Sequence, residues 1–166
     1  MSQNEALEYK NSGHQNLNKS NFDQAIADFT QAVKLNPNDA EIYYNRGVAY
    51  YGIVVTRNDS SSLDLAMENF NQALKLNPDF AMVYTARGGA YFSKGEYDRA
   101  LEDFNRALEL NPGDNYTYYS RGCIYILKDE YERGIKDLET SLRINPDQPD
   151  VINQLEMARK MYKTQK

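Results

Sequence analysis

The dipeptide Asn-Pro recurs four times in this chain, and that recurrence constrains the fold more than any other feature. Its prolines are Pro37, Pro78, Pro112 and Pro146, so the spacings are 41, 34 and 34 residues. Proline lacks a backbone N–H and restricts the residue before it, so each Asn-Pro predicts the end of a helix. We therefore expect a chain of repeated helical units.

Alignment on these prolines shows residue types that recur at fixed positions. A tyrosine precedes a glycine by four residues, and further along a small residue precedes a ring by four. Residues at this spacing share one face of a helix, so each unit is predicted to pair two helices across small residues. The recurring positions are Tyr9, Tyr43, Tyr84 and Tyr118; Gly13, Gly47, Gly88 and Gly122; Ala25, Ala66, Ala100 and Gly134; Phe29, Phe70, Phe104 and Leu138.

This pattern, Tyr-x3-Gly-x2-Tyr followed by Ala-x3-Phe-x2-Ala and Pro, resembles the tetratricopeptide repeat. The resemblance implies an all-α fold, a right-handed superhelical solenoid of α-α hairpins. We expect a single repeat domain over 1–166, and a helix over 149–163 that covers the last repeat with a polar outer face. The apolar stripe of this capping helix is expected to be Val151, Ile152, Leu155, Ala158 and Met161 or Tyr162. The repeats are expected at 6–39, 40–80, 81–114 and 115–148.

The second repeat is seven residues longer than the others. Residues 53–57 could extend its first helix, followed by a loop over 58–62. In that case Val54 and Val55 would be partly exposed. Two interpretations stay open, a tolerated loop insertion and a second contact site.

Composition argues against several classes of function. The net charge of −5 disfavours a protein that binds nucleic acid through its phosphates. His14 and Cys123 are the only histidine and cysteine, so we expect no metal, no cofactor and no catalytic site. No apolar stretch approaches the ~20 residues that span a membrane, and the N-terminus lacks a secretory signal, so a cytoplasmic protein is expected.

Arg46, Arg87 and Arg121 form a basic column directly before the glycines. Such a column could bind an anion. The alternative is structural, with each guanidinium meeting an acid on a neighbouring helix, such as Asp28, Asp103 or Asp137. The sequence favours the structural interpretation.

In the tetratricopeptide repeat family the first helix of each repeat lines the concave surface, and that surface takes the ligand. Helical spacing from the packing columns then gives the inward positions. Many carry apolar or aromatic side chains, and tyrosine is a residue type enriched in interfaces. The alternative is that the rings pack against the next first helix. The candidate groove residues are Leu7, Lys10, His14, Tyr44, Asn45, Val48, Tyr51, Met82, Thr85, Phe92, Tyr116, Tyr119 and Ile126.

The expected function is therefore a non-enzymatic scaffold that holds a partner peptide or helix in an apolar and aromatic groove. Some family members bind acidic chaperone tails through a carboxylate clamp, and here Lys10 and Asn45 match that clamp. His14 matches it partly, whereas Thr85 and Gly89 lack the later cations, so this binding is not favoured. Self-association into a homo-oligomer, through the groove or through Val54 and Val55, is the other open hypothesis.

Overall fold

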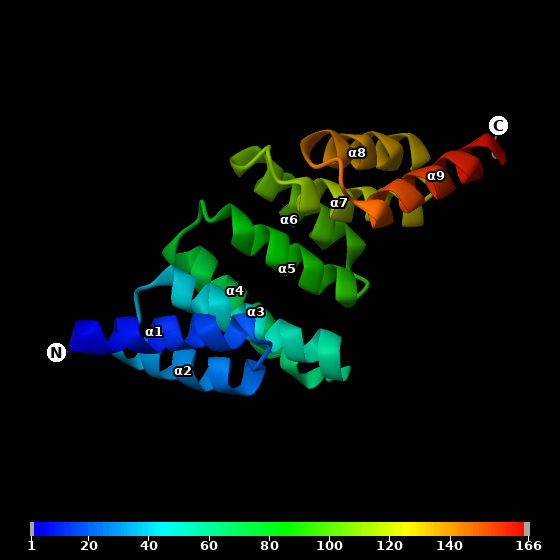
Figure 1. The fold of residues 1–166 in the computed structure, drawn as a ribbon. Helices are drawn as coiled ribbons and strands as arrows, with labels where there is room; N and C mark the ends of the chain where they lie inside the picture. Colours follow the sequence, from blue (N-terminus) through cyan, green and yellow to red (C-terminus); the bar gives the residue numbers. More distant parts are fainter. Residues whose placement is uncertain (1, 165–166) are drawn as a thin grey trace. The chain divides into compact units, whose positions relative to one another are not determined.

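The computed structural model describes residues 2–164, and this part of the chain is helical with no strand (Figure 1). Contacts group the chain into two compact units that meet in sequence between Ala86 and Arg87, and each unit is described by itself. The first holds α1–α4 and the beginning of α5, and the second holds the remainder of α5 and α6–α9. The helices are α1 Ser2–Asn18, α2 Phe22–Leu35, α3 Ala40–Arg57, α4 Ser61–Leu76, α5 Ala81–Ser93, α6 Tyr97–Leu110, α7 Asn115–Leu127, α8 Tyr131–Ile144 and α9 Pro149–Thr164.

The even-numbered helices end at the Asn-Pro dipeptides, as predicted. In each case the asparagine leaves the helical region, with φ between −132° and −138°. Its N–H still donates to the carbonyl four residues earlier, and proline then prevents a further turn. These asparagines are Asn36, Asn77, Asn111 and Asn145.

Three hairpins turn at one left-handed residue, which is Ser20, Gly95 or Asp129, with φ of 57°, 75° and 60°. The next amide then donates back to the carbonyl five residues earlier, at 2.8–3.0 Å, for example from Glu96 to Tyr91. This bond satisfies a carbonyl that the end of the helix leaves open. A short turn then leads directly into the second helix of the hairpin.

Each hairpin closes on the predicted glycine. A Cβ atom placed on Gly13, Gly47 or Gly88 would lie 2.6–2.7 Å from the ring of Phe29, Phe70 or Phe104. These rings are fully buried, so a side chain in place of the glycine would have to displace packed core. In the fourth hairpin Leu138 replaces the ring, and the closest atoms to a Cβ on Gly122 would be 3.2 Å away.

The seven extra residues of the second repeat lengthen α3, as expected. The end of α3 contacts α2: the ring of Phe22 covers Gly52, just before the extension, and Arg57 within the extension forms two hydrogen bonds with Asp23 at 2.7 and 3.1 Å. The expected loop over 58–62 is too long, because α4 begins at Ser61. The Asp59 carboxylate accepts hydrogen bonds from the amide and hydroxyl of Ser61, which starts the helix early.

Within the second unit α9 packs on the last hairpin through Val151, Leu155 and Ala158, which are buried. The prediction was wrong for Ile152, which is exposed on one flank of the helix. Of the two alternatives at the end of the stripe, Tyr162 is half-buried and Met161 is exposed. The buried face of α9 is therefore narrower than the apolar stripe in its sequence. Met161 instead adds to an exposed apolar surface, which is described below.

Candidate interaction surfaces

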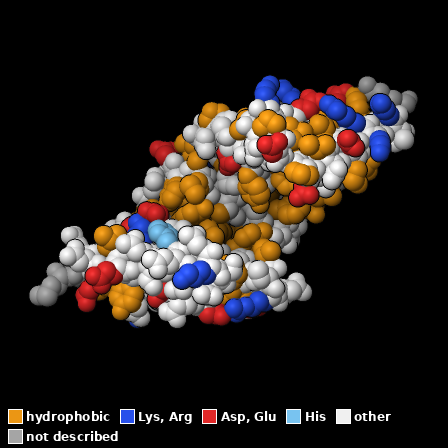
Figure 2. Space-filling view, in the orientation of Figure 1, with side chains coloured by type: hydrophobic (Ala, Val, Ile, Leu, Met, Phe, Trp, Pro, Cys, Tyr) orange, Lys and Arg blue, Asp and Glu red, His pale blue; other side chains and the backbone are white. Residues whose placement is uncertain are grey.

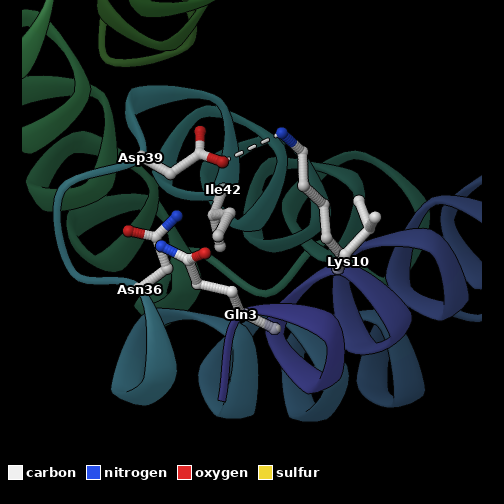
Figure 3. A pocket seen from close by; sticks show the side chains of 7 residues that line it. Gln3, Lys10, Asn36, Asp39 and Ile42 are labelled. Carbon is white, nitrogen blue, oxygen red and sulfur yellow. Dashed lines mark hydrogen bonds and ion pairs between the residues drawn. The ribbon is translucent and has the colours of Figure 1, made fainter. Parts of the chain in front are cut away.

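The predicted basic end of the groove, on α1, is occupied by the protein's own acids. The Nζ atom of Lys10 lies 3.0 Å from Oδ2 of Asp39, the residue that precedes α3 (Figure 3). It also lies 2.5 Å from Oε2 of Glu41 in the first turn of α3. Burial opposes the charge of Lys10, but the two carboxylates outweigh it and raise the pKa of the ammonium group. Nε2 of His14 lies 3.7 Å from Oε1 of the same Glu41. The two groups therefore face acids from α3.

A hollow of about 230 Å³ lies beside this ion pair, between α1 and the segment that enters α3 (Figure 3). Its lining mixes apolar and amide side chains with the two charges of Lys10 and Asp39. Because those charges neutralise each other, the hollow has no excess of one sign. The lining residues are Gln3, Ala6, Leu7, Lys10, Asn36, Asp39 and Ile42.

On α3 the predicted groove residues are more enclosed than the sequence suggested. The ring of Tyr44 lies 5.2 Å from that of Phe80 and 6.4 Å from that of Phe70, between centroids, so it is part of a ring cluster. Asn45 is only 8 % exposed, and its amide donates to the Glu41 carbonyl at 2.7 Å. Asn45 therefore offers little surface to a ligand, which corrects its assignment. Val48 and Tyr51 are half-buried.

Three first helices expose a large apolar side chain at the same repeat position. Leu7 on α1 is 55 % exposed, Met82 on α5 is 54 % exposed, and Tyr116 on α7 is 60 % exposed. The corresponding residue of α3 is Glu41, which is engaged by Lys10. These apolar side chains are not required by the packing of their own hairpins. Thr85, one turn after Met82, is half-buried.

In the second unit, Tyr119 and Ile126 pack against the core formed by Leu138, Val151 and Leu155, so α9 covers part of the predicted groove surface. Burial, followed by the influence of Cys123, raises the pKa of Tyr119 to about 12. Burial likewise raises the pKa of the Cys123 thiol, although its hydrogen bond with Tyr119 acts in the opposite direction. Such a thiol is protonated at neutral pH and is a poor nucleophile.

Three exposed apolar residues beside this surface were missed by the sequence interpretation. Leu127 at the end of α7 is 58 % exposed, and Met157 and Met161 on α9 are 55 % and 45 % exposed. Figure 2 shows hydrophobic side chains gathered over α7 and α9 on the visible face of this unit. The helical period could have separated Met157 and Met161 from the buried stripe, because they fall on one flank of α9.

The arginine column is mainly structural, as favoured. Arg87 and Arg121 each bind an aspartate of the following helix through two hydrogen bonds of 2.7–2.9 Å, to Asp103 and Asp137. Arg46 departs from the expectation. It binds the amide oxygen of Asn69 at 2.8 Å and the Thr30 hydroxyl at 3.3 Å, rather than a carboxylate.

Its expected acid has other partners. Asp28 accepts hydrogen bonds from Ser12, Asn16 and Gln24, at 2.8–3.1 Å. Ser12 occupies the position that arginine holds in the later repeats. The first hairpin therefore keeps the acid of the pair and the second keeps the arginine.

Among residues 2–164, no group of three or more His, Cys, Asp and Glu side chains could hold a metal ion. His14 belongs to the first unit and Cys123 to the second. None of the helices that the structure describes is long and apolar enough to cross a lipid bilayer.

Successive helical hairpins closed by a glycine on a buried ring define an α-helical repeat protein. A family model described as TPR repeat matches residues 13–53 and 57–95, and models described as Tetratricopeptide repeat match 81–114 and 116–148. The chain belongs to the tetratricopeptide repeat family. Its fold is accordingly the all-α repeat solenoid expected from the sequence.

Solved structures agree with this fold. A crystal structure of MamA matches with a TM-score of 0.77 and 24% identity, over 93% of this chain and 81% of that one. PilF of Pseudomonas aeruginosa matches with a TM-score of 0.84 and 21% identity, over 99% and 71%. YrrB, described as a TPR protein with an unusual peptide-binding site, matches with a TM-score of 0.72 and 22% identity, over 91% and 74%.

Proposed function

We propose that this protein is an interaction scaffold that holds a peptide or helix of a protein partner on the exposed apolar faces of its first helices. Proteins of the tetratricopeptide repeat family are generally non-enzymatic interaction modules, and the families that match include no catalytic one. A peptide is named for two structural neighbours, YrrB and the first TPR of Spaghetti (RPAP3), which is bound to an HSP90 peptide, and both lend support by analogy. The partner is a protein; the acidic composition disfavours nucleic acid.

The observation that carries the proposal is the shared exposure of Leu7, Met82 and Tyr116. Equivalent positions in three repeats each place a large apolar side chain in solvent, although hairpin packing does not need them. Exposed apolar and aromatic side chains of this kind can anchor a peptide. Within the second unit, Leu127, Met157 and Met161 are further exposed apolar side chains, and methionine adapts well to varied partners.

The state of Lys10 argues against an acidic terminal carboxylate as the ligand of the first unit. Its ammonium group is already held by Asp39 and Glu41. A carboxylate that arrived there would have to break these contacts and approach two like charges. We therefore propose contacts that are mainly apolar rather than a carboxylate clamp.

A second candidate is self-association, and one observation favours it. Val55 on the extended α3 is 66 % exposed, at a place where the other repeats have no residue. A second copy could cover this side chain. Sedimentation of the wild type and of Val55→Ser over a range of concentrations separates the two candidates: a monomer at tens of micromolar removes self-association.

The main test uses peptides selected from a displayed random library on the purified wild-type protein. We expect the selected peptides to be rich in apolar residues and to lose at least about tenfold in affinity for Tyr116→Ser or Met157→Ser, since removing one buried anchor costs on the order of 1–2 kcal/mol. Because both side chains are exposed, the variants should keep their helical content and thermal stability. These exposed positions are better targets than Tyr44 or Tyr119, whose loss would also disturb packing.

Matched controls are Leu65→Ser on α4 and Ile144→Ser on α8, which remove exposed apolar groups from second helices. Binding should be unchanged in both. If the second-helix variants weaken binding as much as Tyr116→Ser does, the proposed surface is wrong.

A further inference from the structure

We propose that a hollow between α6, α7 and α8 binds a phosphate monoester, either free or on the side chain of a protein. The hollow has a volume of about 240 Å³ and lies within the second unit. It is distinct from the inner surface discussed above, because second helices supply most of its walls. Its lining residues are Asn105, Arg121, Tyr125, Arg133, Lys136 and Asp137.

The charge of this lining is unbalanced. Arg121, Arg133 and Lys136 face a single acid, Asp137. Glu130 pairs with Arg133 from outside the hollow, and the surroundings remain positive with it included. A phosphate monoester carries about −1.5 to −2 charges at neutral pH, so it fits an excess of cations better than a carboxylate does.

The cations also keep hydrogen-bond donors that the protein does not use. The Arg121 guanidinium donates three of its N–H groups to Asp137 and Asn105. The Arg133 guanidinium donates two, to Glu130 and to the Tyr125 hydroxyl. Arginine has five N–H groups, so both retain donors. The Lys136 ammonium forms no hydrogen bond or ion pair with another described residue. Phosphate oxygens accept several such bonds at once.

The side chain of Arg133 is held in place by Tyr125. Its guanidinium carbon lies 3.9 Å from the centroid of the Tyr125 ring, and one of its nitrogens donates to the hydroxyl of the same ring. Arg121 is fixed by its two bonds to Asp137 and by Asn105 at 2.7 Å. Because these side chains are already ordered, a ligand would lose less conformational entropy on binding.

Comparison with the earlier repeats singles out Lys136. The same repeat position holds Glu68 in the second repeat and Glu102 in the third. Glu68 lines a hollow beside Arg46 in the first unit, so that hollow has balanced charge. The fourth repeat therefore reverses one charge on an otherwise shared framework. A packing role does not explain the reversal, because Lys136 is exposed.

The test is a titration of the isotope-labelled full-length protein with inorganic phosphate, phosphoserine and a phosphoserine peptide at constant ionic strength. Chloride and the unphosphorylated peptide are the references. We expect saturable chemical-shift changes at backbone amides around Arg121 and Lys136. Stronger binding of the peptide than of free phosphate would place the monoester on a protein. Equal binding would point to a free phosphate ligand.

Lys136→Glu restores the residue type of the earlier repeats and should weaken phosphate binding at least tenfold, since one favourable charge becomes repulsive. Lys136→Gln should weaken it less. Lys163→Glu makes the same change in net charge on α9, outside the hollow, and should bind like wild type. Tyr116→Ser should also bind phosphate normally. Shifts that never saturate, or equal losses in Lys136→Glu and Lys163→Glu, would overturn the proposal.

Discussion

In the second unit, Arg87 and Arg121 each donate hydrogen bonds to an aspartate sixteen residues later, whereas neither hairpin of the first unit has a complete arginine–aspartate pair. The first hairpin satisfies Asp28 with uncharged donors, and the second satisfies Arg46 with Asn69 and Thr30. Both units nevertheless close each hairpin around the same glycine position. The packing at the glycine position is thus common to both units, whereas the arginine–aspartate pair can be replaced by other hydrogen bonds.

The two units also differ in their content of charged residues. Residues 1–86 contain six Lys and Arg against ten Asp and Glu, whereas residues 87–166 contain 13 against 14. Arginines lie over tyrosine rings in both units, but more closely in the second: Arg46 is 5.6 Å from the centroid of Tyr43, whereas Arg99 is 4.3 Å from that of Tyr91 and Arg133 3.9 Å from that of Tyr125. The arginine-rich hollow for which we propose phosphate binding arises from this difference.

The largest expected effect breaks the shared apolar contact. Gly47→Ala should lower the free energy of unfolding by about 3 kcal/mol, since a Cβ would collide with the buried Phe70 ring. Gly122→Ala should cost less than about 1 kcal/mol, because Leu138 leaves more room and alanine favours the helix. Urea denaturation followed by circular dichroism measures both. Equal costs would mean that the ring does not set the constraint.

The next prediction concerns the polar pair. Asp137→Ala should cost about 2 kcal/mol, because it leaves the half-buried Arg121 guanidinium without its carboxylate. Asn69→Ala should cost only about 1 kcal/mol, since it removes one hydrogen bond to an arginine that keeps Thr30. Asn69→Asp, which completes the pair in the first unit, is the control and should not be destabilising. The same denaturation experiment decides, and a larger loss for Asn69→Ala than for Asp137→Ala would contradict this view.

A smaller effect should appear at alkaline pH. The folded pKa of Tyr119 is raised to about 12 from its ordinary value of 10.0, so the folded state holds this proton more tightly than the unfolded state. Its contribution to stability is complete below pH 10 and is lost as the pH rises toward 12. Thermal melts of wild type and Tyr119→Phe should therefore converge over this range, with the Phe variant showing the weaker pH dependence. Parallel curves would mean that Tyr119 titrates normally.

The smallest effect is expected for two exposed ion pairs that link successive hairpins. Arg57 meets Asp23 in the first unit, and Lys128 meets Asp98 in the second, at 2.7 and 2.5 Å. Solvent screening makes such pairs weak. Arg57→Ala and Lys128→Ala should therefore melt within a degree or so of wild type at physiological salt, and salt should abolish any difference. A large loss in Arg57→Ala alone would show that the extension of α3 depends on this contact.

Several features followed from local chemistry and were therefore predictable. The Asn-Pro dipeptides predicted where the second helices end, and the repeating glycine and phenylalanine predicted which faces meet. The extension of α3 was expected as well. The start of α4 was not predicted. It depends on the Asp59 side chain, which accepts a hydrogen bond from the Ser61 amide, so that the helix begins earlier and the loop is shorter.

The candidate surface was harder to predict. Tyr44, Tyr116 and Tyr119 occupy similar inward positions in the sequence, yet only Tyr116 is largely exposed. Tyr44 meets Phe80 from the segment after α4, and Tyr119 packs against residues of α9. Helical spacing states the direction of a side chain from its own helix, but it does not state what lies opposite.

The sequence by itself determined the family, the hairpins and their close packing, because backbone restrictions and side-chain size act within a few residues or at a fixed repeat. Only the tertiary structure decided that Lys10 is neutralised, that Asn45 is buried, and that Arg121, Arg133 and Lys136 surround one hollow. Charge and exposure at these places depend on side chains from other helices. That dependence is physical: the energy of a charged or apolar group is set by whichever atoms replace water around it.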